Sequence, residues 1–200
     1  MSEIKTHHAR PMPQRPKWGW QAWEATVGYL GTRHNPDATL KIDIYPMQYV
    51  IGWAAALSWG EERESVSDQI SLADVLRNLW AHTLHNHLDL FKHPNVVART
   101  PRGYNDDQWL EDATYEIFSR LVHTTDTIFR GDWHIIVLYR PVERPEKRVQ
   151  ARLLAENNSV QRAGWGPTLH DACRALFHNA APIYSQYRLR DDQEGENTDG

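Results

Sequence analysis

The chain has 200 residues, of which 40% are hydrophobic and 24% charged, and its formal net charge is −4 at pH 7. This composition is ordinary for a globular protein, and the acidic balance gives no general attraction to nucleic acid or to an anionic membrane. No apolar run is long enough for a transmembrane helix, the first residues lack the apolar core of a secretory signal, and Cys173 has no second cysteine to pair with, which together favour the cytoplasm.

The first half of the chain is predicted to begin with a helix and two or three strands. Apolar residues recur at spacings of three and four over residues 19–30, which predicts a helix that ends at Gly31. Alternating apolar and polar residues predict a strand over residues 39–46 that stops at Pro46, and the apolar run over 48–59 favours a second strand. The segment ESVSDQ that follows predicts a third, shorter strand.

Several signals mark the start of a second helix. Ser71 has the side chain of an N-cap, and Asp74 follows three positions later, as in a capping box with the shorter acid. Apolar residues at helical spacing carry this helix to about Phe91, before Pro94. Residues 92–105 hold two prolines and a glycine and are the best candidate for a linker.

The second half repeats this order of elements. The predicted elements are a helix over 106–128, strands over 133–140 and 148–156, a short third strand within NNSVQRAGWG, and a helix over 169–180 that Thr168 caps. The sequence itself also repeats: SLADVLRNLW (residues 71–80) matches TLHDACRALF (residues 168–177) at two leucines, the aspartate and the arginine.

The repeat and the shared element order indicate a duplicated unit, although any capped amphipathic helix can resemble another. We therefore expect an α+β fold with internal duplication of a helix–strand–strand(–strand)–helix unit. Its antiparallel strands are covered by helices, and the two units form either one continuous sheet or two packed faces.

This interpretation divides the chain into five parts. The two ends are polar, one rich in basic residues and proline and the other acidic, which is typical of disorder. The parts are a disordered basic tail (1–17), repeat unit 1 (18–91), the linker (92–105), repeat unit 2 (106–187) and a disordered acidic tail (188–200).

Two resemblances to known families are visible. A helix–strands–helix order with a basic hairpin resembles that of double-stranded-RNA-binding domains, and it implies nucleic-acid binding. The string GWGPTLHDACRAL (164–176) is similar to the G-x-T-L-x-[DE]-A stretch of HicB-type antitoxin domains. The first resemblance is one of element order and the second covers thirteen residues, so neither assigns a family.

A histidine-bearing segment is the candidate for a metal site. On a helix, His82, His85 and Asp89 fall at spacings of three and four along one face, and imidazoles and a carboxylate so placed can bind zinc or another divalent cation. The alternative is a solvated polar helix face. A metal-dependent enzyme centred on these residues is one functional hypothesis.

A basic hairpin is the candidate for nucleic-acid binding. The residues that gather there are Arg140, Arg144, Lys147, Arg148 and Arg152. Glutamates are interleaved with them, which favours a mixed solvated surface instead. A nucleic-acid-binding protein that uses this hairpin is a second hypothesis.

Nine tryptophans, an unusually high number, indicate either a partner surface or a core filled with large side chains. Trp18, Trp20 and Trp23 lie within six positions, so we expect them to dock a protein partner. Cys173 follows His170 by three positions, and a Cys–His pair can make a nucleophile. However, Cys173 aligns with a core leucine of the other repeat, which favours a buried structural thiol.

No catalytic motif stands out in the sequence, and no cofactor is expected. The leading hypothesis is thus a non-catalytic protein–protein interaction protein built from two similar α+β units, with its partner unidentified and its oligomeric state open.

Overall fold

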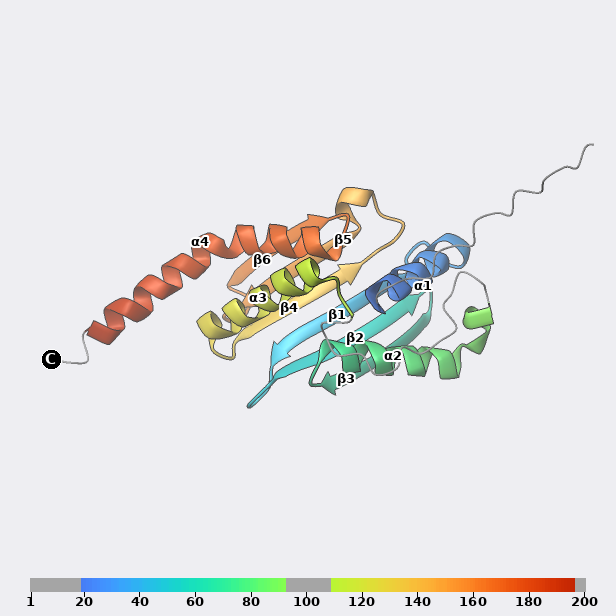
Figure 1. Cartoon of the computed structure of the whole chain (residues 1–200), viewed down its shortest axis with the longest axis horizontal. Helices are drawn as coiled ribbons and strands as arrows, with labels where there is room; N and C mark the ends of the chain where they lie inside the picture. The colour runs from blue at the N-terminus through green and yellow to red at the C-terminus, as the bar shows by residue number, and fades with distance from the viewer. Residues whose placement is uncertain (1–18, 93–108, 197–200) are drawn as a thin grey trace, which may run out of the picture.

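A computed structural model describes residues 19–92 and 109–196 of the chain. Its six strands form one antiparallel sheet in the order β3-β2-β1-β4-β5-β6, and four helices lie on one face of that sheet (Figure 1). The helices are α1 (Gly19–Arg33), α2 (Leu72–Asn86), α3 (Asp112–Phe129) and α4 (Leu169–Glu196). The strands are β1 (Thr39–Pro46), β2 (Ile51–Trp59), β3 (Glu62–Gln69), β4 (Trp133–Tyr139), β5 (Val149–Ala155) and β6 (Val160–Gly166).

The α+β class and the antiparallel sheet covered by helices are confirmed. Each half of the chain has the order helix, three strands, helix, and the two halves meet where β1 pairs with β4 in one continuous sheet. The strand order is therefore mirrored about the β1–β4 pair. Descent from a duplicated unit stays a hypothesis that this mirrored order motivates.

Period-two alternation gives the sheet a buried face and an open face. In the centre, Ile42 of β1, Val137 of β4 and Ala151 of β5 are paired neighbours and at most 1% exposed. The residues between them in sequence point to the other side and are half-buried, as in β1, β4 and β5. We call that side, which no helix of the described residues covers, the open face of the sheet (Figure 1).

Matched caps start α2 and α4, as the repeat predicts. The Ser71 hydroxyl accepts a hydrogen bond from the Asp74 backbone N–H at 3.1 Å, and the Thr168 hydroxyl accepts one from Asp171 at 3.2 Å. Each hydroxyl also donates to the carboxylate of the same aspartate, at 2.8 and 2.7 Å. Both side-chain N-caps are thus confirmed, and they fix where each helix begins.

Three predicted C-terminal helix ends are wrong. Gly31 does not end α1, which continues to Arg33 because the glycine lies under the turn after β4 rather than in a left-handed cap. The second helix ends at Asn86, and a separate 3-10 helix, η1 (Leu88–Lys92), follows it. α4 continues to Glu196, well into the predicted acidic tail, whose arginine, glutamine and glutamate residues are good helix formers.

The predicted tail at 1–17 and almost all of the predicted linker at 92–105 lie outside the described residues. The predicted boundaries of the two units therefore stay predictions. None of the helices in the described ranges combines the length and the apolar character that spanning a membrane requires.

Candidate functional site

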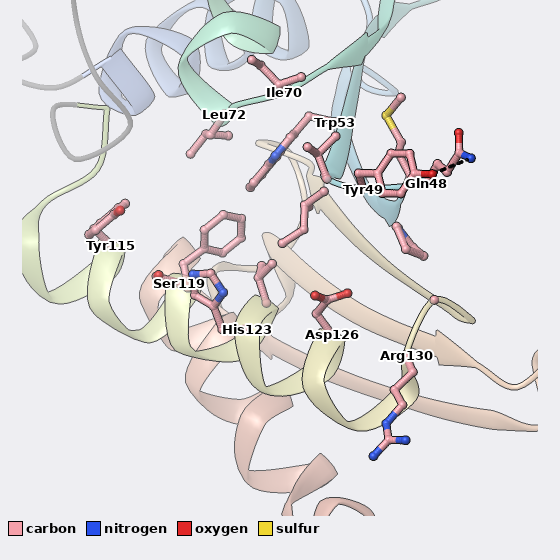
Figure 2. Close-up of a pocket in the computed structure, with 17 residues that line it drawn as sticks. Gln48, Tyr49, Trp53, Ile70, Leu72, Tyr115, Ser119, His123, Asp126 and Arg130 are labelled. Atoms are coloured by element: carbon pink, nitrogen blue, oxygen red, sulfur yellow. Dashed lines mark hydrogen bonds between the residues drawn. The ribbon is translucent and has the colours of Figure 1, made fainter.

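A groove of about 710 Å³ lies on the helix-covered face in the described part of the chain (Figure 2). It lies between the β1–β2 hairpin, the start of α2 and the length of α3. Its floor is apolar, because Trp53 of β2 and Phe118 of α3 meet there with ring centroids 5.8 Å apart. Leu72 and Val122 extend the apolar floor on the two helices.

The rim of the groove gathers large apolar side chains that water reaches. Eight such side chains are exposed in the described residues, and five of them line this groove. These five are Met47, Tyr49, Val50, Ile70 and Tyr115. Tyr49 is 88% exposed and Ile70 is 70% exposed, so these side chains bury little area in the protein itself.

One wall of the groove is polar. Ser119, His123 and Asp126 follow one another at spacings of four and three along α3, on the side that lines the groove, and Arg130 follows at the C-cap of this helix (Figure 2). Asp126 is already held in place, because Trp133 Nε1 donates a hydrogen bond to its carboxylate at 2.9 Å. The groove therefore combines an apolar floor and rim with a single line of hydrogen-bonding groups.

The mirrored position in the other half of the molecule is filled by the chain itself. Trp109 and Leu110 precede α3 and are 0% and 1% exposed, and the Trp109 carbonyl accepts a hydrogen bond from the Trp20 backbone N–H at 3.0 Å. Only a pocket of about 140 Å³ is left beside them, against the starts of α1 and α4. An aromatic residue followed by an aliphatic one thus closes this site, whereas the groove beside α2 has no such segment among the described residues.

The predicted tryptophan docking surface is not supported. Trp20 and Trp23 are 6% and 0% exposed, and Trp18 lies outside the described residues. The reason is that α1 lies flat on the sheet, so Trp20 meets Tyr139 edge-on at 6.1 Å and Trp23 meets Trp80 edge-on at 5.0 Å. Of the eight described tryptophans, seven fill the core and one, Trp165, is exposed.

The structure does not bring the predicted metal ligands together. His82 and His85 lie exposed on α2, but the helix ends at Asn86, so Asp89 belongs to the separate turn η1. Within residues 19–92 and 109–196, no group of three or more His, Cys, Asp or Glu side chains is placed to hold a metal ion. His87 instead lies against β3, with its Nε2 atom 3.0 Å from a Glu64 carboxylate oxygen.

The predicted basic hairpin does not form one basic surface. Arg144 and Lys147 are exposed in the turn between β4 and β5, and Arg140 and Arg148 are half-buried beside it. Arg148 lies near the Glu24 carboxyl of α1, whose pKa is raised by burial and lowered again by the Trp20 Nε1 hydrogen bond and by Arg148. Arg152 of β5 belongs to the open face instead, as its pairing with Ile136 shows. These cations are therefore divided among different surfaces.

Cys173 is the buried thiol that its alignment with Leu76 predicts. Both side chains are 0% exposed, and burial raises the pKa of the Cys173 thiol. His170 lies on α4 with its Nδ1 atom 3.3 Å from the Ala113 carbonyl, so this imidazole has a structural contact of its own.

Sequence reasoning missed the groove because its residues come from three separate segments. One signal was present: Met47, Tyr49 and Val50 are apolar residues at the tip of a hairpin, where turn residues are usually polar. Ile70 gives a second signal, since it stands just before the cap of α2. A scan against protein-family models and a search of curated proteins find no match for this chain.

Proposed function

We propose that this chain is a non-catalytic interaction protein that holds an apolar segment of a partner protein in the groove between the β1–β2 hairpin, α2 and α3. The observation that carries the proposal is the concentration of five of the eight exposed large apolar side chains around one groove. Exposed apolar side chains gathered in this way mark binding surfaces rather than ordinary protein surface.

The composition of the groove supports a peptide segment as the ligand. An apolar floor with a few polar groups fits a ligand whose apolar side chains enter the groove while its main chain stays near the polar wall. Tyr49 and Ile70 stand on the rim and are largely exposed, so they can contact a ligand that extends beyond the hollow itself. At the mirrored position, Trp109 and Leu110 of the chain itself are buried, which supports an apolar occupant for the groove.

A matched pair of variants tests this proposal. Val50 and Val142 are each 50% exposed and lie on the two corresponding hairpins, but only Val50 lines the groove. A library of displayed random peptides is selected on the unaltered full chain, and the winning peptides are measured against Val50→Lys and Val142→Lys. We expect peptides with two or three apolar anchors, a loss of roughly tenfold or more in affinity for Val50→Lys, and unchanged affinity for Val142→Lys.

Three outcomes would contradict the proposal. They are a library that yields no binder, winning peptides that bind Val50→Lys as well as the unaltered chain, and peptides that respond equally to both variants. Circular dichroism checks the fold of the two variants, and we expect both to keep it because both substitutions are at half-exposed positions of turns.

A further inference from the structure

One row of residues crosses the centre of the open face in a defined order. Pairing between adjacent strands places Asp43, Ile136 and Arg152 side by side on β1, β4 and β5. Ala54 of β2 and Ala163 of β6 continue the row at its two ends. Because adjacent strands are about 4.8 Å apart, Asp43 and Arg152 stand at about equal distances from Ile136 on opposite sides.

The two charged groups in this row differ in their partners. Asp43 lies between Lys41, whose Nζ atom is 2.8 Å from one carboxylate oxygen, and His134, whose Nε2 atom is 3.2 Å from the other. Within the described residues, the Arg152 side chain makes no hydrogen bond or ion pair. Its neighbours in the row are Ile136 and Ala163. The Arg152 guanidinium therefore extends from the centre of the sheet with no carboxylate beside it in the row.

We propose that the open face binds the open face of a second copy of this chain, around a two-fold axis that runs along β4. Such an axis exchanges β1 with β5 and keeps each row in place, because these strands flank β4 at equal distances. Asp43 of each copy then faces Arg152 of the other, and the two ion pairs are equivalent. Ile136 lies on the axis and meets its own counterpart.

Side-chain size is complementary under the same axis. The next row places Lys41, Leu138 and Gln150 in register, with Ala56 and Trp165 at its ends on β2 and β6. Since the axis also exchanges β2 with β6, Trp165 of each copy lies over the small side chain of Ala56 of the other. Trp165 is 48% exposed in the single chain and is the one described tryptophan outside the core, so it gains the most from this contact.

The direction of the axis follows from the charges. A two-fold axis across the strands, along the central row, places every strand over the same strand of the other copy. Asp43 then faces Asp43 of the other copy, and Arg152 faces Arg152. That arrangement is repulsive at both positions. The axis along β4 is the one that pairs opposite charges, and it leaves β3 outside the contact because the sheet has no strand on the far side of β6.

The size of the contact sets the expected strength of the dimer. Two packed sheets lie about 10 Å apart, with their strands within about 30° of each other. Because Asp43 and Arg152 lie only one strand from the axis, such a rotation displaces them only slightly relative to each other. Five strands about 4.8 Å apart and about 17 Å long project to roughly 300–400 Å². This is a small contact compared with standard interfaces of about 800 Å² of accessible surface per partner, so we expect a dimer that dissociates on dilution.

Sedimentation velocity of the full chain across a wide concentration range tests the proposal. We expect a monomer–dimer equilibrium that Arg152→Glu weakens roughly tenfold or more, because it sets a carboxylate against Asp43 in both pairs. Arg152→Gln removes the ion pair without adding repulsion, so its effect should be smaller. Arg63→Glu is the matched charge reversal on β3, outside the contact, and should leave the equilibrium unchanged.

Crosslinking tests the axis itself. Cys173 is buried, so Ile136→Cys introduces a single accessible thiol on the proposed axis. A short bis-maleimide should join two such chains, whereas Arg63→Cys, placed on β3, should give little crosslinked product. Circular dichroism of both variants confirms that they are folded before crosslinking.

Several results overturn the proposal. A chain that stays monomeric at millimolar concentration has no such interface, and a dimer that Arg152→Glu leaves intact uses another surface. A dimer that Val50→Lys dissociates while Arg152→Glu does not would place the second copy in the groove instead. Equal crosslinking of Ile136→Cys and Arg63→Cys would contradict the axis along β4.

Discussion

Gly164 of β6 lies so close to α4 that a Cβ atom at this position would overlap the backbone nitrogen of Leu176. The Ala172 carbonyl oxygen and the Ala175 backbone carbon lie within overlap distance of the same position. The close contact of α4 with the edge of the sheet thus depends on the absence of a side chain, and the obstructing atoms are backbone that no rotamer change can move.

Gly164→Ala should therefore lower the free energy of unfolding by about 1–3 kcal/mol or more, because the new methyl group overpacks the contact between β6 and α4. Gly28→Ala is the control: nothing lies within 4 Å of its Cβ position in α1, so helix propensity should raise stability by up to about 1 kcal/mol. Urea denaturation of the two variants measures both effects. Equal stability of Gly164→Ala and the unaltered chain would contradict the tight contact.

The two helix caps should contribute equally. Ser71→Ala and Thr168→Ala each remove a hydroxyl that accepts from a helix N–H and donates to an aspartate, so each should cost about 1 kcal/mol. Ser185→Ala serves as the control, because its hydroxyl only donates back to the Ala181 carbonyl inside α4. Denaturation midpoints compare the three, and a neutral Thr168→Ala would show that the second cap does not hold the start of α4.

The parts of the fold that could be predicted from the sequence are those that local chemistry decides. Strand alternation and the two side-chain N-caps depend on neighbours within a few positions, and the structure confirms them. The end of the second helix was misplaced because residues 82–91 show helical spacing, while the actual stop at Asn86 follows from packing of His87 against Trp59 and Glu64.

The candidate site could not be predicted because it depends on how distant segments meet. Trp20 and Trp23 look like a surface cluster in sequence, yet Tyr139 and Trp80, far along the chain, bury them. The groove shows the reverse case, in which an aromatic residue stays exposed. The β1–β2 hairpin and α3 line opposite sides of the groove, and no described residue covers Tyr49. Which aromatic residue is buried is decided by the sheet order, and this order is not encoded in any local pattern.

Asp43 should stabilise the fold at neutral pH and stop doing so in acid. Burial tends to raise the pKa of this carboxyl, but the interactions with His134 and Lys41 outweigh burial and hold the pKa below its ordinary value of 3.8. The folded state thus favours the carboxylate, so the stabilisation is present above about pH 4 and is lost as the pH falls through the lowered pKa. Asp43→Asn should cost about 1–2 kcal/mol at pH 7 and progressively less as the pH falls through the lowered pKa. A pH-independent difference in urea denaturation would argue against this assignment.

Glu24 should behave in the opposite sense. Burial raises its pKa above the ordinary 4.5, partly offset by the hydrogen bond from Trp20 Nε1, which is 2.8 Å from the carboxylate. The folded state disfavours the charged form, so the carboxylate lowers the free energy of unfolding at neutral pH. This destabilisation disappears as the pH falls below about 4.5. Glu24→Gln keeps an oxygen for Trp20 and should raise stability at pH 7 but not at pH 4. A variant that is less stable than the parent at pH 7 would show that the attraction to Arg148 exceeds the cost of burial.

Cys173 should be unreactive in the folded protein. Its side chain is fully buried, and burial raises the pKa of the thiol, so the nucleophilic thiolate is scarce at neutral pH. Labelling with a thiol reagent should therefore be negligible under native conditions and reach one equivalent in denaturant, with a rate that follows unfolding. Because the position corresponds to the core residue Leu76, Cys173→Ser should cost about 1–3 kcal/mol by burying a hydroxyl. Rapid stoichiometric labelling of the native chain, with the fold intact by circular dichroism, would instead identify an accessible, activated thiol and reopen the Cys173–His170 pair as a nucleophile.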